Sequence, residues 1–313
     1  MRAPALAAAS DPLHVRLWAY QRERFPLFRT ALLLSAFTSA SVNASAWLGG
    51  RPLPGVATYA TAFVLALVLM FELRVLDEFK DHETDRAHRP ERPVPRGLVT
   101  LRLLAGLGAA AACMAVAAAL LLDPRLVLIL GLVGAFMALM TVHFFVPRLL
   151  HASLALTLAS HMLVMPLIDF LVTACEWLPR GGGPPDGLWV FLGLSFANGC
   201  VLEIGRKTWA PEAERAGVES YSSAWGLSLA LLAWTGCLAA ALTLLAVLSA
   251  ILKTVLIVIA ALPAVAFGLF AAARLLRQQD RAAQAQLDAA AGFWVLTAYL
   301  AAGYAPLAAR LLP

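Results

Sequence analysis

Charge is scarce in this chain. Asp, Glu, Lys and Arg together make up 14% of its 313 residues, whereas 61% of the residues are hydrophobic. A soluble globular domain carries about 25% charged residues, so this composition, with its mean hydropathy of +0.78, excludes an ordinary soluble enzyme. It is typical of an integral membrane protein.

Paired cysteines and aromatic-rich basic patches are also missing. The four cysteines form no C-x-x-C pair and fall in or beside apolar segments, so we expect small buried side chains: Cys113, Cys175, Cys200 and Cys237. No basic patch is interleaved with aromatic residues, which argues against nucleic-acid binding. The apolar stretch within the first twelve residues is too short for a signal peptide, so we expect no cleaved signal.

Long apolar segments are what the chain has in abundance. Nine of them are long enough, or nearly so, to cross a hydrocarbon core about 30 Å thick. They lie near residues 28–47, 56–75, 98–121, 126–146, 151–173, 187–205, 222–248, 251–273 and 288–310. We therefore predict an all-α fold, a bundle of about nine transmembrane helices. Because the spans depend on one another, residues 1–313 are predicted to form a single domain.

The distribution of basic residues predicts the orientation of these spans. With a cytoplasmic N-terminus, only five of the 24 Lys and Arg residues fall on the outer side: Arg51, Arg125, Arg180, Lys253 and Arg310. Basic residues concentrate on the cytoplasmic side of membrane proteins, and the opposite orientation would reverse the ratio. The net charge of +5 is thus a topology signal that suits contact with anionic membrane lipids.

The densest charge directly follows the second span. Five carboxylates, followed by three arginines of the next loop, are the candidate functional residues there: Asp77, Glu78, Asp81, Glu83, Asp85, Arg89, Arg92 and Arg96. Asp77, Asp81 and Asp85 are four residues apart, so a helix would place them on one face, where like charges repel. Mg²⁺ would offset this repulsion, because it prefers carboxylate oxygens combined with substrate phosphates. The alternative is a solvated acidic turn at the end of a helix.

A second charged cluster follows the sixth span. Four spans separate it from the first cluster, so both lie on the same side of the membrane, which we predict to be cytoplasmic. Its candidate metal ligands are Glu203, Glu212 and Glu214, and its candidate phosphate contacts are Arg206 and Lys207. Taken alone, the segment could equally be a basic cytoplasmic loop that only sets topology.

Facing carboxylates, Mg²⁺ and basic side chains form a set that suits one kind of chemistry. Metal ions bridge a diphosphate, neutralise its charge and stabilise it as a leaving group. If the ester carbon is allylic, departure of the diphosphate leaves a resonance-stabilised carbocation. A chamber inside the membrane would protect this cation from water.

The first cluster resembles a motif of the UbiA superfamily of intramembrane prenyltransferases. That motif is Asn/Asp-Asp-x-x-Asp-x-x-x-Asp, followed by a segment similar to Arg-Pro-x-x-x-Gly. Here Asp77, Glu78, Asp81 and Asp85 occupy the four acidic positions, and residues 92–97 (RPVPRG) supply the sequel. The resemblance implies nine helices around a central cavity, with acidic motifs after the second and sixth helices, and Mg²⁺-dependent transfer of a prenyl group.

The second cluster departs from the pattern of this family. Members usually carry Asp-x-x-x-Asp there, whereas no aspartate lies between Asp186 and Asp280. Glu214, followed by Arg215 and Gly217, is the nearest counterpart of the second aspartate. Glu203 or Glu212 could stand for the first, and Lys207 lies where a carboxylate would be expected. The number of metal ions and the acceptor therefore stay open.

Five further polar residues lie within the predicted spans. Asn43, His143, His161, Asp169 and Asn198 could line a cavity, since polar groups in membrane helices face inward. Each could instead form an interhelical hydrogen bond. We retain Asn43 and Asn198 as candidate substrate contacts, and Asn198 is favoured because it approaches the second cluster. Asp169 lies near the outer end of its span and is assigned no chemistry.

The sequence thus predicts an enzyme that ionises a prenyl diphosphate and transfers the prenyl group to a lipophilic acceptor, aromatic acceptors included. The predicted catalytic residues are Asp77, Asp81, Asp85 and Lys207. The predicted metal ligands for Mg²⁺ are Asp77, Glu78, Asp81, Asp85, Glu203, Glu212 and Glu214. The predicted substrate contacts are Arg89, Arg92, Arg96, Arg206, Lys207, Asn198 and Asn43.

Two alternatives remain at the level of sequence. A terpene cyclase of the UbiA type would use the same ionisation machinery, but a double bond of the prenyl chain itself would capture the cation. A membrane transporter would place its ionisable residues near the middle of the bilayer. Here the charge lies at the ends of spans, which favours an enzyme.

Overall fold

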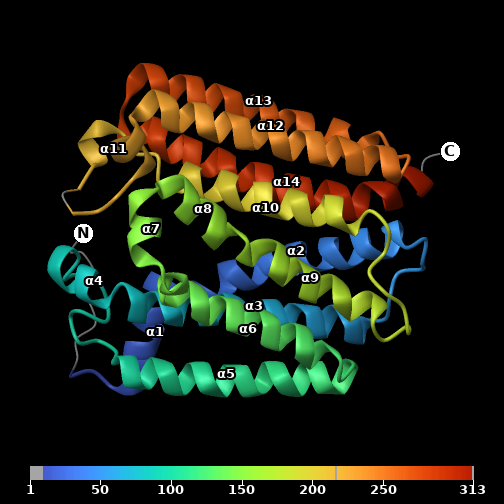
Figure 1. The fold of residues 1–313 in the computed structure, drawn as a ribbon, viewed down its shortest axis with the longest axis horizontal. Helices are drawn as coiled ribbons and strands as arrows, with labels where there is room; N and C mark the ends of the chain where they lie inside the picture. Colours follow the sequence, from blue (N-terminus) through green and yellow to red (C-terminus); the bar gives the residue numbers. More distant parts are fainter. Residues whose placement is uncertain (1–9, 216, 312–313) are drawn as a thin grey trace.

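The computed structural model describes residues 10–215 and 217–311, and in that part of the chain the regular structure is entirely helical (Figure 1). Most of the stretch expected to lack a cleaved signal therefore lies outside the described residues. The elements are α1 Leu13–Arg24, α2 Leu27–Leu48, α3 Val56–Lys80, α4 His82–His88, α5 Leu101–Leu122, α6 Leu126–Thr141, η1 His143–Phe145, α7 Pro147–Ala152, α8 Leu154–Met162, α9 Val164–Trp177, α10 Leu188–Arg206, η2 Pro211–Ala213, α11 Tyr221–Trp225, α12 Leu227–Ile251, α13 Leu256–Gln278 and α14 Arg281–Leu311.

The prediction of an all-α membrane bundle is confirmed. Eight helical segments within the described residues are long and apolar enough to cross a membrane, with α8 and α9 counted together. The remaining predicted span, near residues 126–146, corresponds to α6, which is apolar but has only 16 residues. Helix α14 begins at Arg281, seven residues before the predicted boundary, because its first two turns are good helix formers without being apolar.

Two predicted spans are not single continuous helices, and a proline lies close to each break. The span predicted over residues 126–146 ends at Thr141, and His143, Phe144 and Phe145 then take positive φ angles ahead of Pro147. Proline disfavours the α conformation in the residue before it. The span predicted over 151–173 divides into α8 and α9, and Pro166 lies in the first turn of α9. Its ring replaces the N–H that would have continued α8.

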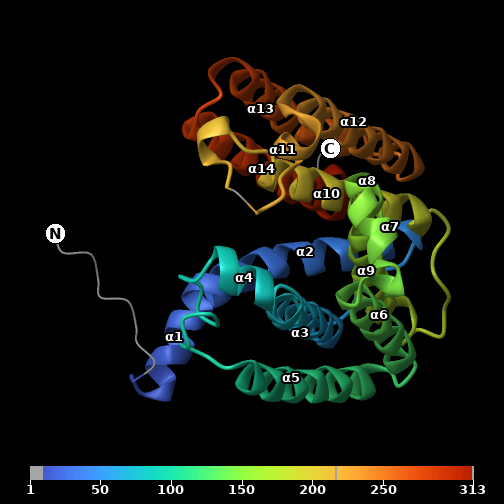
Figure 2. The ribbon, with the colours of Figure 1, turned by 60° about the vertical axis from the view of Figure 1, so that its left-hand side comes forward.

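The helices form two packed groups on either side of α2 and α9. Figure 2 shows α10 to α14 on one side of the bundle and α3, α5 and α6 on the other. One core, built around Trp234 and Trp294, fills the first group, and a second core, built around Leu65 and Ile168, fills the other. Helix α2 packs against α3, α9 and α14, so it joins the two groups.

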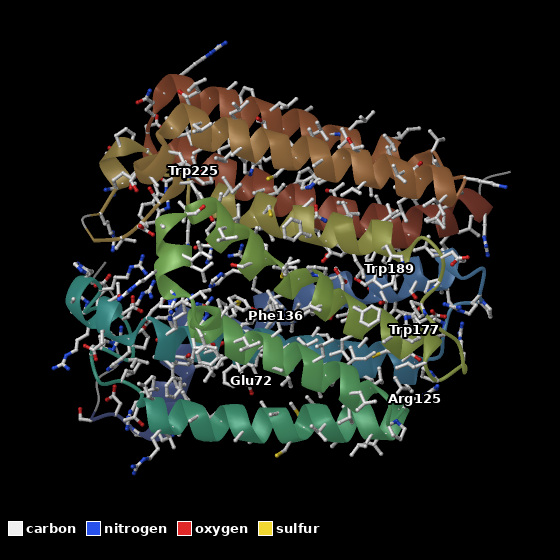
Figure 3. The ribbon with its side chains drawn as sticks, viewed as in Figure 1. Glu72, Arg125, Phe136, Trp177, Trp189 and Trp225 are labelled. Atoms are coloured by element: carbon white, nitrogen blue, oxygen red, sulfur yellow. The ribbon has the colours of Figure 1, made fainter. Side chains whose placement is uncertain are left out.

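The bundle has two chemically different ends. We call the end where α3 stops at Lys80 and α10 stops at Arg206 the charged end; α4 and α11 lie there, at the left of Figure 1. At the opposite end, the fully buried carboxylate of Glu176 accepts hydrogen bonds from Arg51, Arg180 and Ser45, at 2.8 to 2.9 Å. Arg125, Trp177 and Trp189 mark this opposite end in Figure 3.

Close packing of α14 on α2 depends on Gly303. A Cβ atom at this position would lie 2.5 Å from the Cα atom of Ala40, and backbone cannot move aside as a flexible side chain can. We expect Gly303→Ala to lower the free energy of unfolding in detergent by about 1–3 kcal/mol, the usual cost of overpacking.

The matched control for this prediction lies on the same helix. Nothing lies within 4 Å of a Cβ atom built at the exposed Gly292. Gly292→Ala should therefore stabilise the helix by about 0.5–1 kcal/mol. Equal denaturation curves for the two variants would contradict the assigned packing of α14 against α2.

Candidate active site

The first acidic cluster lies where α3 gives way to α4. The backbone N–H groups of Asp81, Asp85 and Arg89 each donate to the carbonyl four residues earlier, at 2.8 to 2.9 Å. The helical spacing of Asp77, Asp81 and Asp85 is therefore kept, although the backbone of Asp81 departs from α geometry and separates the two helices. The sequence spacing thus places these three carboxylates one turn apart at the charged end.

The carboxylates of this cluster differ in their partners. Asp77 is 42% exposed and contacts Arg74 at 3.3 Å. Asp81 is partly exposed. Asp85 is buried, contacts Arg89 at 3.5 Å and forms a short ion pair with Arg92. Its charge is therefore already neutralised by two arginines from the following loop.

Glu78 lies apart from the three aspartates. Its side chain is 1% exposed and its Oε1 accepts a hydrogen bond from Arg24 of α1, at 2.5 Å. Positions 77 and 78 are successive on α3, so their side chains leave the helix about 100° apart. The structure thus uses Glu78 to hold α1, which packs beside α3 through Tyr20.

The arginine loop between α4 and α5 folds back on itself. Turns close it, with the N–H of Arg96 donating to the carbonyl of Arg92 and that of Leu98 to Pro93. Partial burial and the neighbouring Arg92 hold the pKa of Arg89 below its ordinary value. Arg96 points elsewhere, because both of its terminal nitrogens donate to Glu23 of α1, at 2.8 and 2.9 Å.

The second cluster is centred on Glu203, in the last turn of α10. Its carboxylate accepts from Arg206 at 2.5 Å and from Lys207 at 2.7 Å, so one acid faces two cations. Both cations are partly exposed, with 58% and 43% of their side chains accessible. This wall of the site therefore presents net positive charge.

The structure does not bring Glu212 and Glu214 to Glu203. Glu212 accepts a hydrogen bond from the backbone N–H of Arg281, at 2.9 Å, and so caps the start of α14. Glu214 accepts from the hydroxyl groups of Ser220 and Ser222, each at 2.7 Å. Both glutamates therefore fix the shape of the loop that follows α10.

Two cations connect the clusters across the bundle, Lys80 at the end of α3 and Arg206 at the end of α10. Lys80 interacts electrostatically with Asp77 and Asp81 on its own side and with Glu203 and Lys207 on the other. Arg206 likewise interacts with Asp77 and Arg74. Acids and bases from both groups of helices thus converge on one region at the charged end.

The two loops that follow α4 and α10 also approach each other. His88 lies against Gly217, whose φ of +75° and lack of a Cβ permit this contact. Arg215 contacts Glu91 at 3.5 Å. A pocket of about 440 Å³ opens between the loops and the start of α14, lined by Arg89, Glu91, Arg92, Trp209, Ala213, Arg215, Arg281 and Gln284.

Three of the five polar residues predicted within the spans form interhelical hydrogen bonds. Asn43 accepts a hydrogen bond from Tyr59 at 2.6 Å, towards the opposite end. Asn198 accepts from Trp294 at 2.9 Å, while its buried Nδ2 finds no partner among the described residues. Asp169 is fully buried and accepts from Tyr299 and Ser41, at 2.6 and 2.8 Å. These contacts bind α2, α3, α9, α10 and α14 together.

The donor chemistry at the end of α3 suits Mg²⁺. Proteins hold this ion through one or two carboxylates and let substrate phosphates complete the coordination. Asp77 and Asp81, one turn apart and partly exposed, can supply these carboxylates. Among the described residues, no three His, Cys, Asp or Glu side chains form a group that could hold a metal by themselves.

The comparison with protein families decides what kind of bundle this is. The profile of the UbiA prenyltransferase family matches residues 32–297. The chain belongs to the UbiA prenyltransferase family. The matched segment includes both charged clusters and all helices from the middle of α2 to the middle of α14. No curated protein matches the chain by sequence.

Solved structures of UbiA homologues share the fold at low sequence identity. A UbiA homologue from Aeropyrum pernix K1, solved without ligand, has 17% identity and a TM-score of 0.67, with 90% of this chain and 98% of the homologue covered. A structure described as digeranylgeranylglyceryl phosphate synthase has 16% identity and a TM-score of 0.61, covering 94% and 99%. A homologue from Archaeoglobus fulgidus, bound to DMAPP and Mg²⁺, has 14% identity and a TM-score of 0.56, covering 91% and 99%.

Sequence reasoning missed two basic residues that the structure brings to the charged end beside Asp77. Arg74 and Lys80 bracket Asp77 at intervals of three residues, so all three share one side of α3. This spacing was the available signal, because basic residues three positions either side of a predicted metal ligand share its face of the helix.

Proposed function

We propose that this chain is a Mg²⁺-dependent enzyme that ionises a prenyl diphosphate within the membrane and transfers the prenyl group to a lipophilic acceptor. The observation that carries the proposal is the convergence of Asp77 and Asp81 with four cations, Arg74 and Lys80 from α3 and Arg206 and Lys207 from the end of α10. The DMAPP and Mg²⁺ bound to the Archaeoglobus fulgidus homologue support the same substrate class and metal here.

In this proposal each side chain has a defined task. Asp77 and Asp81 hold Mg²⁺, and bound Mg²⁺ neutralises the diphosphate and stabilises it as a leaving group. Lys80, Arg206 and Lys207 donate hydrogen bonds to the phosphate oxygens from both sides of the bundle, which places positive charge where the leaving group gains negative charge. The apolar side chains of the spans surround the prenyl chain and exclude water from the cation.

The site is proposed to face the cytoplasm. The charged end carries the two basic loops and the pocket between them, and basic residues favour the cytoplasmic side. A soluble diphosphate head could then enter from water while its prenyl tail stays in the apolar interior. The domain is proposed to span the full chain, because both groups of helices contribute to the site.

The deciding experiment follows products and diphosphate release from detergent-solubilised protein. A panel of prenyl diphosphates would be incubated with and without aromatic acceptors, and products identified by mass spectrometry. Prenylated acceptor supports the proposed transferase. Cyclic hydrocarbons or alcohols formed without acceptor would identify a terpene cyclase, and the absence of diphosphate release under every condition would favour a transporter.

The arginine loop gives a further expected result. Arg89 and Arg92 line the pocket at the charged end, so the double change Arg89→Gln and Arg92→Gln should raise the KM for prenyl diphosphate at least fivefold, about 1 kcal/mol. Insertion and yield should match those of Arg277→Gln, which removes an exposed arginine at the same end.

A second comparison separates anchoring from substrate binding in this loop. Arg96→Gln removes the contact with Glu23 and leaves Arg89 and Arg92 in place. The KM of this variant for prenyl diphosphate therefore measures how far substrate binding depends on the attachment of the loop to α1. An unchanged KM in the Arg89 and Arg92 double variant would leave these arginines with a role in topology alone.

A further inference from the structure

Lys80 and His161 form a pair that the ionisation step does not explain. The Nζ atom of Lys80 lies 3.0 Å from Nε2 of His161, and Nδ1 of His161 lies 2.9 Å from the carbonyl oxygen of Thr157. A carbonyl only accepts hydrogen bonds, so the proton on the ring resides on Nδ1. An ammonium group only donates, so Nε2 presents its lone pair to Lys80. The contacts thus define a neutral imidazole with a basic nitrogen directed at the site.

The position of His161 joins it to both charged clusters. It lies in the last turn of α8, just before the break ahead of α9, and its side chain is partly buried. Its charged and titratable neighbours are Lys80 from α3, Lys207 from the end of α10 and His143, whose ring centre is 6.0 Å away. Lys80, Lys207 and His143 all disfavour a charged imidazole before the reaction begins, and only the hydrogen bond to the carbonyl of Thr157 opposes them among the contacts described.

We propose that His161 Nε2 accepts the proton that the reaction releases, a role that rests on the proposed function. Transfer breaks the bond between the prenyl carbon and the diphosphate oxygen and forms a bond between that carbon and the acceptor. The acceptor then loses a proton from the attacked ring carbon or hydroxyl group. Cyclisation that ends in an alkene loses a proton too, so a proton acceptor serves both chemistries.

Lys80 makes this nitrogen available only when substrate is present. In the free protein its ammonium group covers Nε2. A diphosphate bound between α3 and α10 offers charged oxygens, which form stronger hydrogen bonds with an ammonium group than a neutral imidazole does. Rotation of Lys80 onto the phosphate therefore uncovers Nε2 beside the newly formed cation. The carbonyl of Thr157 keeps the ring oriented throughout.

The alternative is that His161 merely tethers Lys80, and one substitution separates the two roles. His161→Gln keeps an oxygen that can accept the hydrogen bond from Lys80, but an amide does not take up a proton. Ionisation is measured by positional isotope exchange, in which a diphosphate ester labelled with ¹⁸O at the bridging oxygen returns the label to non-bridging positions. Deprotonation is measured by the ratio of final product to prenyl alcohol, which forms when water captures the cation.

The expected result for His161→Gln is isotope exchange at the parental rate or faster, with the ratio of product to alcohol at least tenfold lower. His14→Gln, on an exposed face of α1, is the matched control, and His143→Gln tests whether the neighbouring ring can substitute. Both should keep the parental ratio. An unchanged ratio in His161→Gln would overturn the proposal and assign the proton to the diphosphate or to solvent.

Loss of isotope exchange together with product in His161→Gln would also overturn it, because His161 would then act on ionisation. Failure of the proposed function itself looks different. In that case the unaltered protein would show neither isotope exchange nor diphosphate release with any prenyl diphosphate tested.

Discussion

Asp81→Ala is expected to lower turnover of prenyl diphosphate at least 100-fold, about 2.7 kcal/mol in the activation barrier. Asp81 ends α3 one turn after Asp77 and is placed to share a metal ion with it. Loss of one of the two proposed ligands would remove charge that would hold Mg²⁺, and a bound Mg²⁺ would stabilise the diphosphate as a leaving group. Asp77→Ala and Asp85→Ala should also lose most activity, the latter because Arg89 and Arg92 would lose their shared partner.

The same experiment contains its own control within the acidic cluster. Glu83 lies on α4 among these aspartates, but its side chain is exposed. Glu83→Ala should therefore retain near-parental turnover, and size-exclusion chromatography should show every variant folded in detergent. Exhaustive chelation with EDTA should stop the unaltered enzyme, and Mg²⁺ should restore it. Near-normal turnover by Asp81→Ala, or activity that survives chelation, would refute the metal assignment.

Lys207→Met should slow ionisation in a single turnover at least tenfold, about 1.4 kcal/mol. Lys207 and Arg206 both contact Glu203, so one carboxylate cannot neutralise the pair and positive charge remains for a phosphate oxygen. This attraction is stronger in a chamber poor in water than at an open surface. Lys253→Met removes an exposed lysine near the opposite end and should leave the rate unchanged.

Two glutamates near Lys207 refine this expectation. Glu203→Gln would leave Arg206 and Lys207 without their shared partner, so it tests whether Glu203 orients them. Glu214→Gln tests the hypothesis that Glu214 acts on the diphosphate, whereas its contacts with Ser220 and Ser222 indicate a role in the loop. Parental ionisation rates in both Lys207→Met and Glu214→Gln would reduce this segment to a topological anchor.

Local regularities explain what could be predicted from the sequence. The turn-by-turn spacing of Asp77, Asp81 and Asp85 follows from helical periodicity, which needs no knowledge of distant residues. The division of α8 from α9 was not predicted, although Pro166 inside the predicted span was a signal for it. The apolar spans followed from the length needed to cross a membrane.

Partners distant in sequence explain what could not be predicted. From the sequence, Glu212 was predicted to be a metal ligand. In the structure it accepts a hydrogen bond from the backbone N–H of Arg281, 69 positions later. Glu78 is directed to α1 by Arg24, which lies 54 positions earlier. His161 gains its significance from Lys80, 81 positions away. Only the fold places these pairs together.

Glu176 has a consequence for how the protein is made. The ion pair joins the loop after α2 to the end of α9, and its two residues are 125 positions apart. Arg51 is synthesised long before Glu176, so the pair forms only after the helices between these two residues have been made. A carboxylate without its cations is costly at membrane depth. Until Arg51 and Arg180 reach it, Glu176 must be kept in contact with water or with the insertion machinery, which makes closure of this end a late event in biogenesis.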